Sequence, residues 1–379
     1  MDFVHHDRNK KGIDAIMQSR QLILSLLPRF DSYVVGLRNA MKLSVESTIQ
    51  SIMAILGFKY WIETSYCDDG RFQNVADLID IDGLMVQYSN SYLGMVLGIG
   101  EEGIAVPVEF AKKFLESFAD LNLNKIDVES KGFLIDTLIQ RCLKGALQRL
   151  RVPIPLQNFL IGCLSPQKGE TVFDPCCGVG DLLIGAMRHA HSRLTVAGID
   201  ASRMASKIFL LRSVIEYGVG GATELMLPND IMGKVKYERS FDIAICYPTM
   251  GRRLPKMVSM IELPGKIAQM SEIQALMHCL NATKAGGRIG IILPDVLIES
   301  DSFGVFREWV EPQAELIFSY AFDAQRFNFS LPPTSVSGLI FVKRQSLKCS
   351  RDEIAMAVDE PIDNAVAAFN AFRASRQIW

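Results

Sequence analysis

After Pro153 the chain alternates between short apolar runs and longer helical stretches, and this alternation constrains the fold more than any other feature. Runs of this kind predict strands, and the helical segments between the early runs predict crossover connections. Strands that are covered on both faces appear as continuous apolar runs, so we predict an α/β fold with a parallel sheet between helical layers. Only a loop separates the last two runs, which predicts a closing hairpin. The runs are ETVFDP, LTVAGID, TELMLPND, FDIAICYP, GGRIGIILPD, AELIFSYAF and SGLIFVKR.

The regions on either side of this alternating part have a different pattern. Residues 13–60 carry apolar positions at helical spacing that Pro28 interrupts, and residues 106–151 again have helical spacing. The segments IAMAV and AVAAFNAF near the end of the chain predict one or two terminal helices. We therefore predict three parts, which are a helical N-terminal domain at 1–150, an α/β domain at 151–348 and a C-terminal helical tail at 349–379.

Composition excludes several classes of protein. A net charge of -2 and a pI near 6.3 provide no general attraction to nucleic acid or anionic membranes, so DNA contact requires a local basic patch or a partner. No apolar run approaches the ~20 residues that span a bilayer. The charged N-terminus lacks the apolar core of a secretory signal, and the eight cysteines lack the spacing of a metal site or a disulfide framework. These features predict a cytoplasmic protein with reduced cysteines, no bound metal and no membrane contact.

The sheet region begins with a glycine turn in TVFDPCCGVGDLL, residues 171–183. The predicted strand ends at Asp174, the turn contains Gly178 and Gly180, and a helix starts near Asp181. Such a turn lets a ligand approach the backbone where the helix N-terminus points its N–H groups. An ordinary tight turn between a strand and a helix is the alternative for the glycines alone.

Two further acidic residues follow neighbouring predicted strands. Asp200 ends the second strand, where a carboxylate is placed to accept hydrogen bonds from ribose hydroxyls. Asp230 follows the third strand and is placed to contact an adenine amine. Together with Asp174, these positions favour a nucleoside-containing cofactor over an ordinary turn.

The segment DPCCGVGD resembles the D-P-x-C-G-x-G motif of class I S-adenosylmethionine-dependent methyltransferases. More narrowly, the chain is similar to N6-adenine DNA methyltransferases of the kind that serve as modification subunits in type I restriction–modification systems. The resemblance spans roughly residues 120–344 and implies a Rossmann-like, seven-stranded sheet whose last strand is antiparallel. It also implies S-adenosylmethionine as cofactor and a partner subunit that reads DNA. The motifs that carry it are KGFLIDTLIQRCL, RVPIPLQNFLIGCLSP, GGRIGIILPDVLI and VFREWV, and the cofactor residues that it implies are Asp174, Cys177, Gly178, Gly180, Asp200 and Asp230.

The stretch FDIAICYPTMG at 241–251 departs from the family's F-D-x-x-x-x-N-P-P-[FY]-G motif. In the family, the Asn side chain and the first Pro carbonyl accept hydrogen bonds from the adenine amine, and the aromatic residue stacks on the flipped base. Here Pro248 is retained, whereas Tyr247 places a weaker acceptor further out. Met250 lacks a stacking face that contributes ~1–3 kcal/mol per base. We therefore predict that adenine N6 methylation is lost or very weak.

Two smaller features bear on ligands. Ile154 and Pro155 stand where the family has Thr-Pro, so one hydroxyl near the cofactor is missing. Arg252, Arg253 and Lys256 follow the altered motif and are placed to contact DNA phosphates. A solvated basic loop is the alternative for these three residues.

The sequence leaves three classes of function open. The first is a methyltransferase homologue with impaired catalysis that binds nucleic acid or a partner, with S-adenosylmethionine as a ligand. The second is an active DNA methyltransferase of a modification system that uses the atypical motif Tyr247-Pro248-Thr249-Met250. The third is a purely structural subunit. For each we expect DNA to be reached through a complex, with a protein partner or a second copy of the chain.

Overall fold

A computed structural model describes most of the chain, which is divided into two compact units. One unit comprises residues 1–148 with 210–220, and the other comprises 149–209 with 221–379. The predicted boundaries at 150/151 and 348/349 stay predictions. The described residues are 2–67, 80–97, 106–142, 145–218, 223–225, 240–254, 263, 267–322, 335–344, 355–357 and 360–379.

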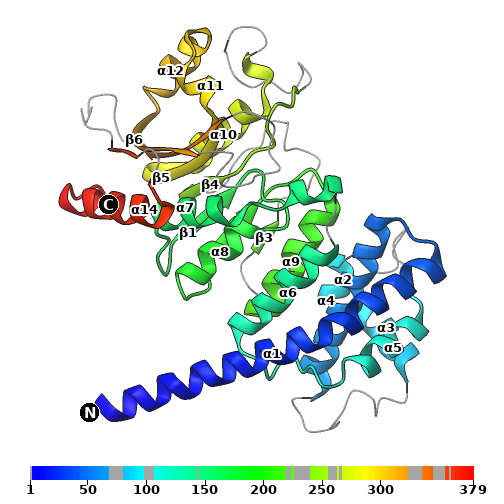
Figure 1. The fold of residues 1–379 in the computed structure, drawn as a ribbon. Coiled ribbons are helices and arrows are strands. Elements are labelled where there is room, and N and C mark those ends of the chain that lie inside the picture. Colours follow the sequence, from blue (N-terminus) through cyan, green and yellow to red (C-terminus); the bar gives the residue numbers. More distant parts are fainter. Residues whose placement is uncertain are drawn as a thin grey trace. The chain divides into compact units, whose positions relative to one another are not determined.

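The first unit is built from helices (Figure 1). We predicted that Pro28 interrupts the first helical segment, and this is wrong because the first helix runs through it. Proline removes the hydrogen bond to the carbonyl four residues earlier. That carbonyl belongs to Leu24, which is 51% exposed, so water can replace the missing donor. The helices are α1 (Asp2–Met41), α2 (Val45–Ile62), a π-helical turn (Glu63–Cys67), α3 (Ile81–Ser89), α4 (Tyr92–Leu97), α5 (Val108–Ser117) and α6 (Val128–Cys142).

An aromatic cluster holds α1 against α5. The Tyr33 ring lies 5.1–6.4 Å from the rings of Phe110, Phe114 and Phe118. Its hydroxyl donates a hydrogen bond to the Phe110 carbonyl at 2.7 Å, so the buried polar tip is satisfied. The predicted helical stretch at 106–151 is divided into α5, α6 and a 3₁₀ turn at Gly145–Leu150. In the described part of the chain, no helix is both long and apolar enough to cross a membrane.

The second unit contains one mixed sheet, which confirms the predicted α/β fold. The strand order is β3-β2-β1-β4-β5-β7-β6-β8. The first five strands are parallel, and β7 is inserted antiparallel between β5 and β6, as predicted for the last strand of a seven-stranded sheet. The strands are β1 (Thr171–Asp174), β2 (Thr195–Gly198), β3 (Thr223–Leu225), β4 (Phe241–Cys246), β5 (Thr283–Pro294), β6 (Ala314–Phe322), β7 (Val336–Lys343) and β8 (Ala355–Ala357).

The short strand β8 corrects one prediction. We predicted a helix for IAMAV, but its residues Ala355–Ala357 pair in parallel with β6 and extend the sheet to an eighth strand. The outer edge of β6 offers backbone groups that a passing segment can satisfy, and this outweighs the local helix preference of alanine. The segment AVAAFNAF lies within a helix, α14 (Ile362–Ser375).

Helices cover both faces of the sheet (Figure 1). On one face, α7 (Ile154–Leu164) packs on β5 and β7, α8 (Asp181–His189) packs on β1 and β2, and α14 packs on α7. On the other face, α10 (Ser271–Ala282) packs on β1, β4 and β5, and shares one buried cluster with α11 (Asp295–Glu299) and α12 (Gly304–Val310). Helix α9 (Arg203–Tyr217) begins in this unit, and its residues from 210 onward belong to the helical unit.

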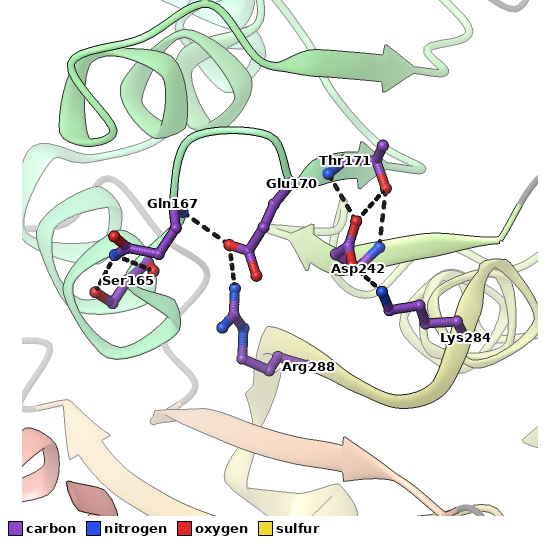
Figure 2. A network of polar contacts seen from close by, with 7 residues as sticks. All are labelled: Ser165, Gln167, Glu170, Thr171, Asp242, Lys284 and Arg288. Carbon is purple, nitrogen blue, oxygen red and sulfur yellow. Dashed lines mark hydrogen bonds and ion pairs between the residues drawn. The ribbon is translucent and has the colours of Figure 1, made fainter. Parts of the chain in front are cut away.

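A polar network ties together the amino ends of β1, β4 and β5 (Figure 2). Asp242 accepts hydrogen bonds from the Thr171 backbone N–H at 2.9 Å and the Thr171 hydroxyl at 2.8 Å, and it pairs with Lys284. Arg288 of β5 pairs with Glu170 just before β1 at 2.5 Å. Asp242 matches the family motif, and the structure places it at this end of β4, a strand's length away from the YPTM loop.

Candidate functional site

The carboxyl ends of β2, β1 and β4 form one edge, because these strands are parallel neighbours. Asp174 lies opposite Gly198 in register, and Phe173 lies opposite Ala244. The glycine turn after β1, Asp200 after β2 and the loop 247–250 after β4 therefore meet at this edge. Ligands of open parallel sheets bind at such an edge. Asp230 lies outside the described residues.

The glycine turn needs both of its glycines. Gly178 has φ +54° and Gly180 has φ +82°, which is a backbone region that favours glycine. A Cβ at Gly178 would lie 2.4 Å from the Leu150 carbonyl oxygen, and one at Gly180 would lie 2.1 Å from the Phe209 ring. The Gly180 N–H donates to the Cys177 carbonyl at 2.8 Å and closes the turn. Val179 between the glycines is fully buried, so its side chain packs inside the protein.

Asp174 carries an unsatisfied polar atom. Its side chain is 1% exposed, and its Oδ1 accepts a hydrogen bond from the Cys176 N–H at 2.9 Å. Its Oδ2 is buried without a hydrogen-bond partner. Burial, together with the charges of Asp200 and Asp181, raises the pKa of Asp174 well above its usual value. A buried polar atom left open in this way is typical of a ligand site, because each such group costs free energy until it is paired.

Asp200 holds the glycine turn in place and still has lone pairs that can accept hydrogen bonds from a ligand. Its Oδ2 accepts a hydrogen bond from the Gly178 N–H at 2.9 Å, and its Oδ1 accepts one from the Ser202 N–H at 2.7 Å. Burial raises the pKa of Asp200, although both backbone bonds act in the opposite direction. A carboxylate has about four lone-pair sites, so about two remain for further donors. The residue is half-buried, so part of its surface stays open to solvent.

Asp181 is a residue of this site that sequence reasoning placed only as a helix start. It is 2% exposed and accepts hydrogen bonds from the Arg151 Nε at 2.7 Å and the Val152 N–H at 2.9 Å. These bonds fasten the segment before α7 to the first turn of α8. Ile154, at the start of α7, is 69% exposed. No sequence signal connects Arg151 with a carboxylate 30 positions later.

The YPTM loop, residues 247–250, is fastened to the start of α10. The Thr249 carbonyl accepts a hydrogen bond from the Ser271 hydroxyl at 2.6 Å, and the Gly251 N–H donates to Glu272, which is 1% exposed. Tyr247 is half-buried, and burial raises its pKa to about 12, so its hydroxyl is neutral at physiological pH. Sequence reasoning missed Glu272, because a glutamate in the first turn of a helix is usually solvated.

The other loop residues differ in exposure. Pro248 is buried and Met250 is half-buried. Arg252 and Arg253 are exposed, and their backbone is held because the Arg252 carbonyl accepts a hydrogen bond from the Ser271 N–H at 3.0 Å. Lys256 lies outside the described residues. Cys177 is buried, and its N–H donates to the Ile199 carbonyl at 2.8 Å. Across the described ranges, no group of His, Cys, Asp or Glu side chains is arranged to hold a metal ion.

Three features define the class I S-adenosylmethionine-dependent methyltransferase fold. They are the strand order with its antiparallel β7, the glycine turn after β1 and the acidic residue after β2. Residues 150–307 match the family model for N-6 DNA Methylase, which covers less than half of the chain. Several solved structures of this fold align with 82–95% of this chain and with 73–98% of their own length. Because the sequence identities are 14–15%, these similarities establish a shared fold only.

Three of these solved structures illustrate the likeness. A Listeria monocytogenes chain described as a candidate class I S-adenosylmethionine-dependent methyltransferase has a TM-score of 0.65 and 14% identity, covering 95% of this chain and 98% of that one. A modification subunit of a candidate type I restriction enzyme from Vibrio vulnificus has a TM-score of 0.62 and 14% identity, covering 86% and 83%. A type I methyltransferase subunit from Streptococcus thermophilus has a TM-score of 0.55 and 15% identity, covering 82% and 73%.

Proposed function

We propose that this chain is an N6-adenine DNA methyltransferase-like protein that binds S-adenosylmethionine and has lost all or nearly all methyl transfer. On this proposal it acts as a subunit that binds nucleic acid or a partner protein. The match of residues 150–307 to the N-6 DNA Methylase family supports the class of protein. The main evidence for impaired methyl transfer is Tyr247. Its neutral phenol stands at the start of a loop that hydrogen bonds hold in place.

The residues at the sheet edge fit the cofactor. The free lone pairs of Asp200 suit the two ribose hydroxyls, and the unpaired Oδ2 of Asp174 suits a further polar group. The turn at Gly178 brings backbone close to a ligand, and Asp230 is proposed at the adenine amine. S-adenosylmethionine, when bound, supplies an electrophilic methyl group on a positively charged sulfur.

We expect Asp200→Ala to weaken S-adenosylmethionine binding, because the substitution removes a charged acceptor of the ribose hydroxyls. Hydrogen bonds to charged groups contribute about 1.5–3 kcal/mol. This corresponds to a rise in Kd of about 10- to 150-fold, measured by isothermal titration calorimetry. The test separates a retained cofactor site from a purely structural subunit, for which the unaltered chain would show no binding.

A matched control is Asp127→Ala in the helical unit. Asp127 also accepts a backbone hydrogen bond, from the Ser130 N–H at 2.8 Å, so its removal reproduces the loss of a backbone partner without touching the site. The control should be less stable and should bind the cofactor as the unaltered chain does. Equal cofactor affinity in Asp200→Ala and the unaltered chain would show that the ribose lies elsewhere.

The geometry of the loop explains why Tyr247 is a poor substitute for asparagine. A phenol oxygen projects several ångströms beyond the position of an amide oxygen, so the backbone would have to withdraw to bring it to the same place. Bonds at Thr249 and Gly251 hold the backbone directly after it. A misplacement of one ångström can cost ~10²-fold in rate. We therefore propose that the loop cannot position an adenine amine.

We expect the double substitution Tyr247→Asn with Met250→Phe to produce trace adenine methylation where the unaltered chain produces none. The change restores an amide acceptor and a stacking face on a loop whose backbone anchors are unchanged. The measurement is transfer of a radiolabelled methyl group from S-adenosylmethionine to duplex DNA that contains adenine.

Two controls make this result interpretable. Adding Asp200→Ala to the double variant should remove the trace activity, and Met250→Phe alone should leave the chain silent. A silent double variant that still binds the cofactor would show that more than these two positions block catalysis. Robust adenine methylation by the unaltered chain would overturn the proposal in favour of an active enzyme with an atypical motif.

We also propose that the chain reaches DNA through a complex. A solved structure with a TM-score of 0.60 and 12% identity comes from work on the complex assembly of a type I restriction–modification system. Here, a net charge of -2 provides little general attraction to DNA, and the exposed Arg252 and Arg253 offer a small local patch. Tight, sequence-specific binding by the isolated chain at physiological salt, measured by fluorescence anisotropy, would contradict this.

A further inference from the structure

Three cysteines from separate elements meet beneath the candidate site. Cys176 lies in the turn after β1, Cys246 is the last residue of β4, and Cys279 lies in α10. Phe173 of β1 lies opposite Ala244 of β4, so the segments just beyond these residues bring Cys176 and Cys246 close together. Burial raises the pKa of Cys246, and the neighbouring Cys176 and Cys279 thiols raise it further. Cys246 and Cys279 are 0% exposed members of one buried cluster, and the half-buried Cys176 packs against it.

The three thiols differ in access. Cys176 is the one that is partly exposed, on the edge where ligands are proposed to bind. Cys246 and Cys279 are 0% exposed, so reagents in solution do not reach these two thiols directly. Cys177, although adjacent in sequence, has its sulfur against Gly198 of β2, away from β4. A reagent therefore meets Cys176 first, and the buried thiol of Cys246 lies at the end of the neighbouring strand β4.

We propose that Cys176 and Cys246 form an oxidation site, in which a peroxide converts the two thiols into a reversible disulfide between the glycine turn and the YPTM loop. This inference does not depend on cofactor binding or methyl transfer. It requires two neighbouring thiols, one accessible and one behind it, and β1 and β4 are hydrogen-bonded neighbours whose ends carry them.

The chemistry has two steps. The Cys176 sulfur attacks one peroxide oxygen, so that an S–O bond forms, the O–O bond breaks, and the departing hydroxide leaves as water with the thiol proton. The Cys246 sulfur then attacks the Cys176 sulfur, so that an S–S bond forms, the S–O bond breaks, and a second water leaves with the Cys246 proton. The two thiols lose two electrons, and the peroxide is reduced to two waters.

The disulfide would join the glycine turn to the YPTM loop, which are the two loops of the candidate site that carry Gly178 and Tyr247. Cys176 is two residues before Gly178, and Cys246 directly precedes Tyr247. A covalent link there ties the turn that holds Asp200 to the loop at the end of β4. Cys279 belongs to the same buried cluster as Cys246 and is 0% exposed, so a peroxide does not reach it directly.

Peptide mapping tests the proposal directly, because trypsin separates the three cysteines. Cys176 and Cys177 fall in peptide 169–188, Cys246 in 240–252 and Cys279 in 267–284. The full chain is treated with hydrogen peroxide under native conditions, quenched with iodoacetamide, digested and analysed by mass spectrometry. We expect a cross-link between 169–188 and 240–252, with the loss of two free thiols per chain, and recovery of both thiols after dithiothreitol.

Single variants identify the sulfurs. Cys176→Ala and Cys246→Ala should each abolish this cross-link, whereas Cys177→Ala, Cys279→Ala and the buried control Cys163→Ala in α7 should retain it. The proposal is overturned if all thiols of the unaltered chain stay free, or if the linked peptides are 240–252 and 267–284. Persistence of the cross-link in Cys176→Ala would equally overturn it, because Cys177 would then be the partner.

Discussion

Gly180→Ala is expected to lower the free energy of unfolding of the sheet unit by about 2–5 kcal/mol. Two costs combine at this position. Alanine is disfavoured at φ +82°, and its Cβ would lie 2.1 Å from the buried ring of Phe209. The ring is 0% exposed and cannot move into solvent, so the turn or α9 must shift. Urea denaturation followed by circular dichroism measures the loss.

Gly169→Ala, in the same unit, is the matched control for this substitution. Gly169 has φ +91°, a similar backbone conformation, and a Cβ there would meet nothing within 4 Å. It should therefore show the backbone cost alone, about 1–2 kcal/mol. Equal losses in the two variants would show that contact with Phe209 contributes nothing, and the turn would then tolerate a side chain.

Lys59→Met is expected to lower the free energy of unfolding of the helical unit by about 3–5 kcal/mol, because it leaves the buried Glu63 carboxylate without its charged partner. The Lys59 ammonium lies 2.6 Å from Glu63, and the two side chains are 0% and 1% exposed. Glu63 also accepts a hydrogen bond from the Leu123 N–H at 2.7 Å. Arg20→Met, which breaks an exposed pair with Glu129, should cost no more than about 1 kcal/mol.

The loss in Lys59→Met should depend on pH. Burial raises the pKa of Glu63 even with Lys59 present, and removing Lys59 takes away an effect that lowers it. A carboxyl with a raised pKa in the folded state contributes stability that is present at low pH and is lost as the pH rises through that pKa. The deficit should therefore be smaller near about pH 5 than near about pH 8. Adding Glu63→Gln, which retains an acceptor for Leu123, should recover part of the stability, and a deficit independent of pH would contradict this account.

Much of the sheet unit could be predicted from the sequence, because burial on both faces leaves a clear pattern of apolar runs. The strand at 241–246 and the glycine turn at 178–180 were recognisable from the residues alone. Pro28 and β8 were predicted wrongly because tertiary context decided both. The first helix continues through Pro28, and Ala355–Ala357 pair with the edge of β6.

The site was predictable to the extent that its residues follow strands. Asp174 ends β1, Asp200 lies two residues after β2 and Tyr247 follows β4, so their meeting at one edge follows from the topology of these parallel strands. The residues that hold the site in place were not predictable. Glu272 anchors the YPTM loop from a helix 21 residues further along, and its pairing depends on three-dimensional packing that leaves no local signal.

The polar network at the amino ends of β1, β4 and β5 has a consequence for how this chain can diverge. Strand register is secured there by Asp242, Lys284, Thr171, Glu170 and Arg288, at the end of the sheet where no ligand is proposed to bind (Figure 2). Substitutions in the loop at 247–250 leave those contacts untouched. The contacts that secure the register and the residues of the candidate site therefore lie at opposite ends of the same strands, so a substitution in the loop can alter the chemistry of the site without weakening this network.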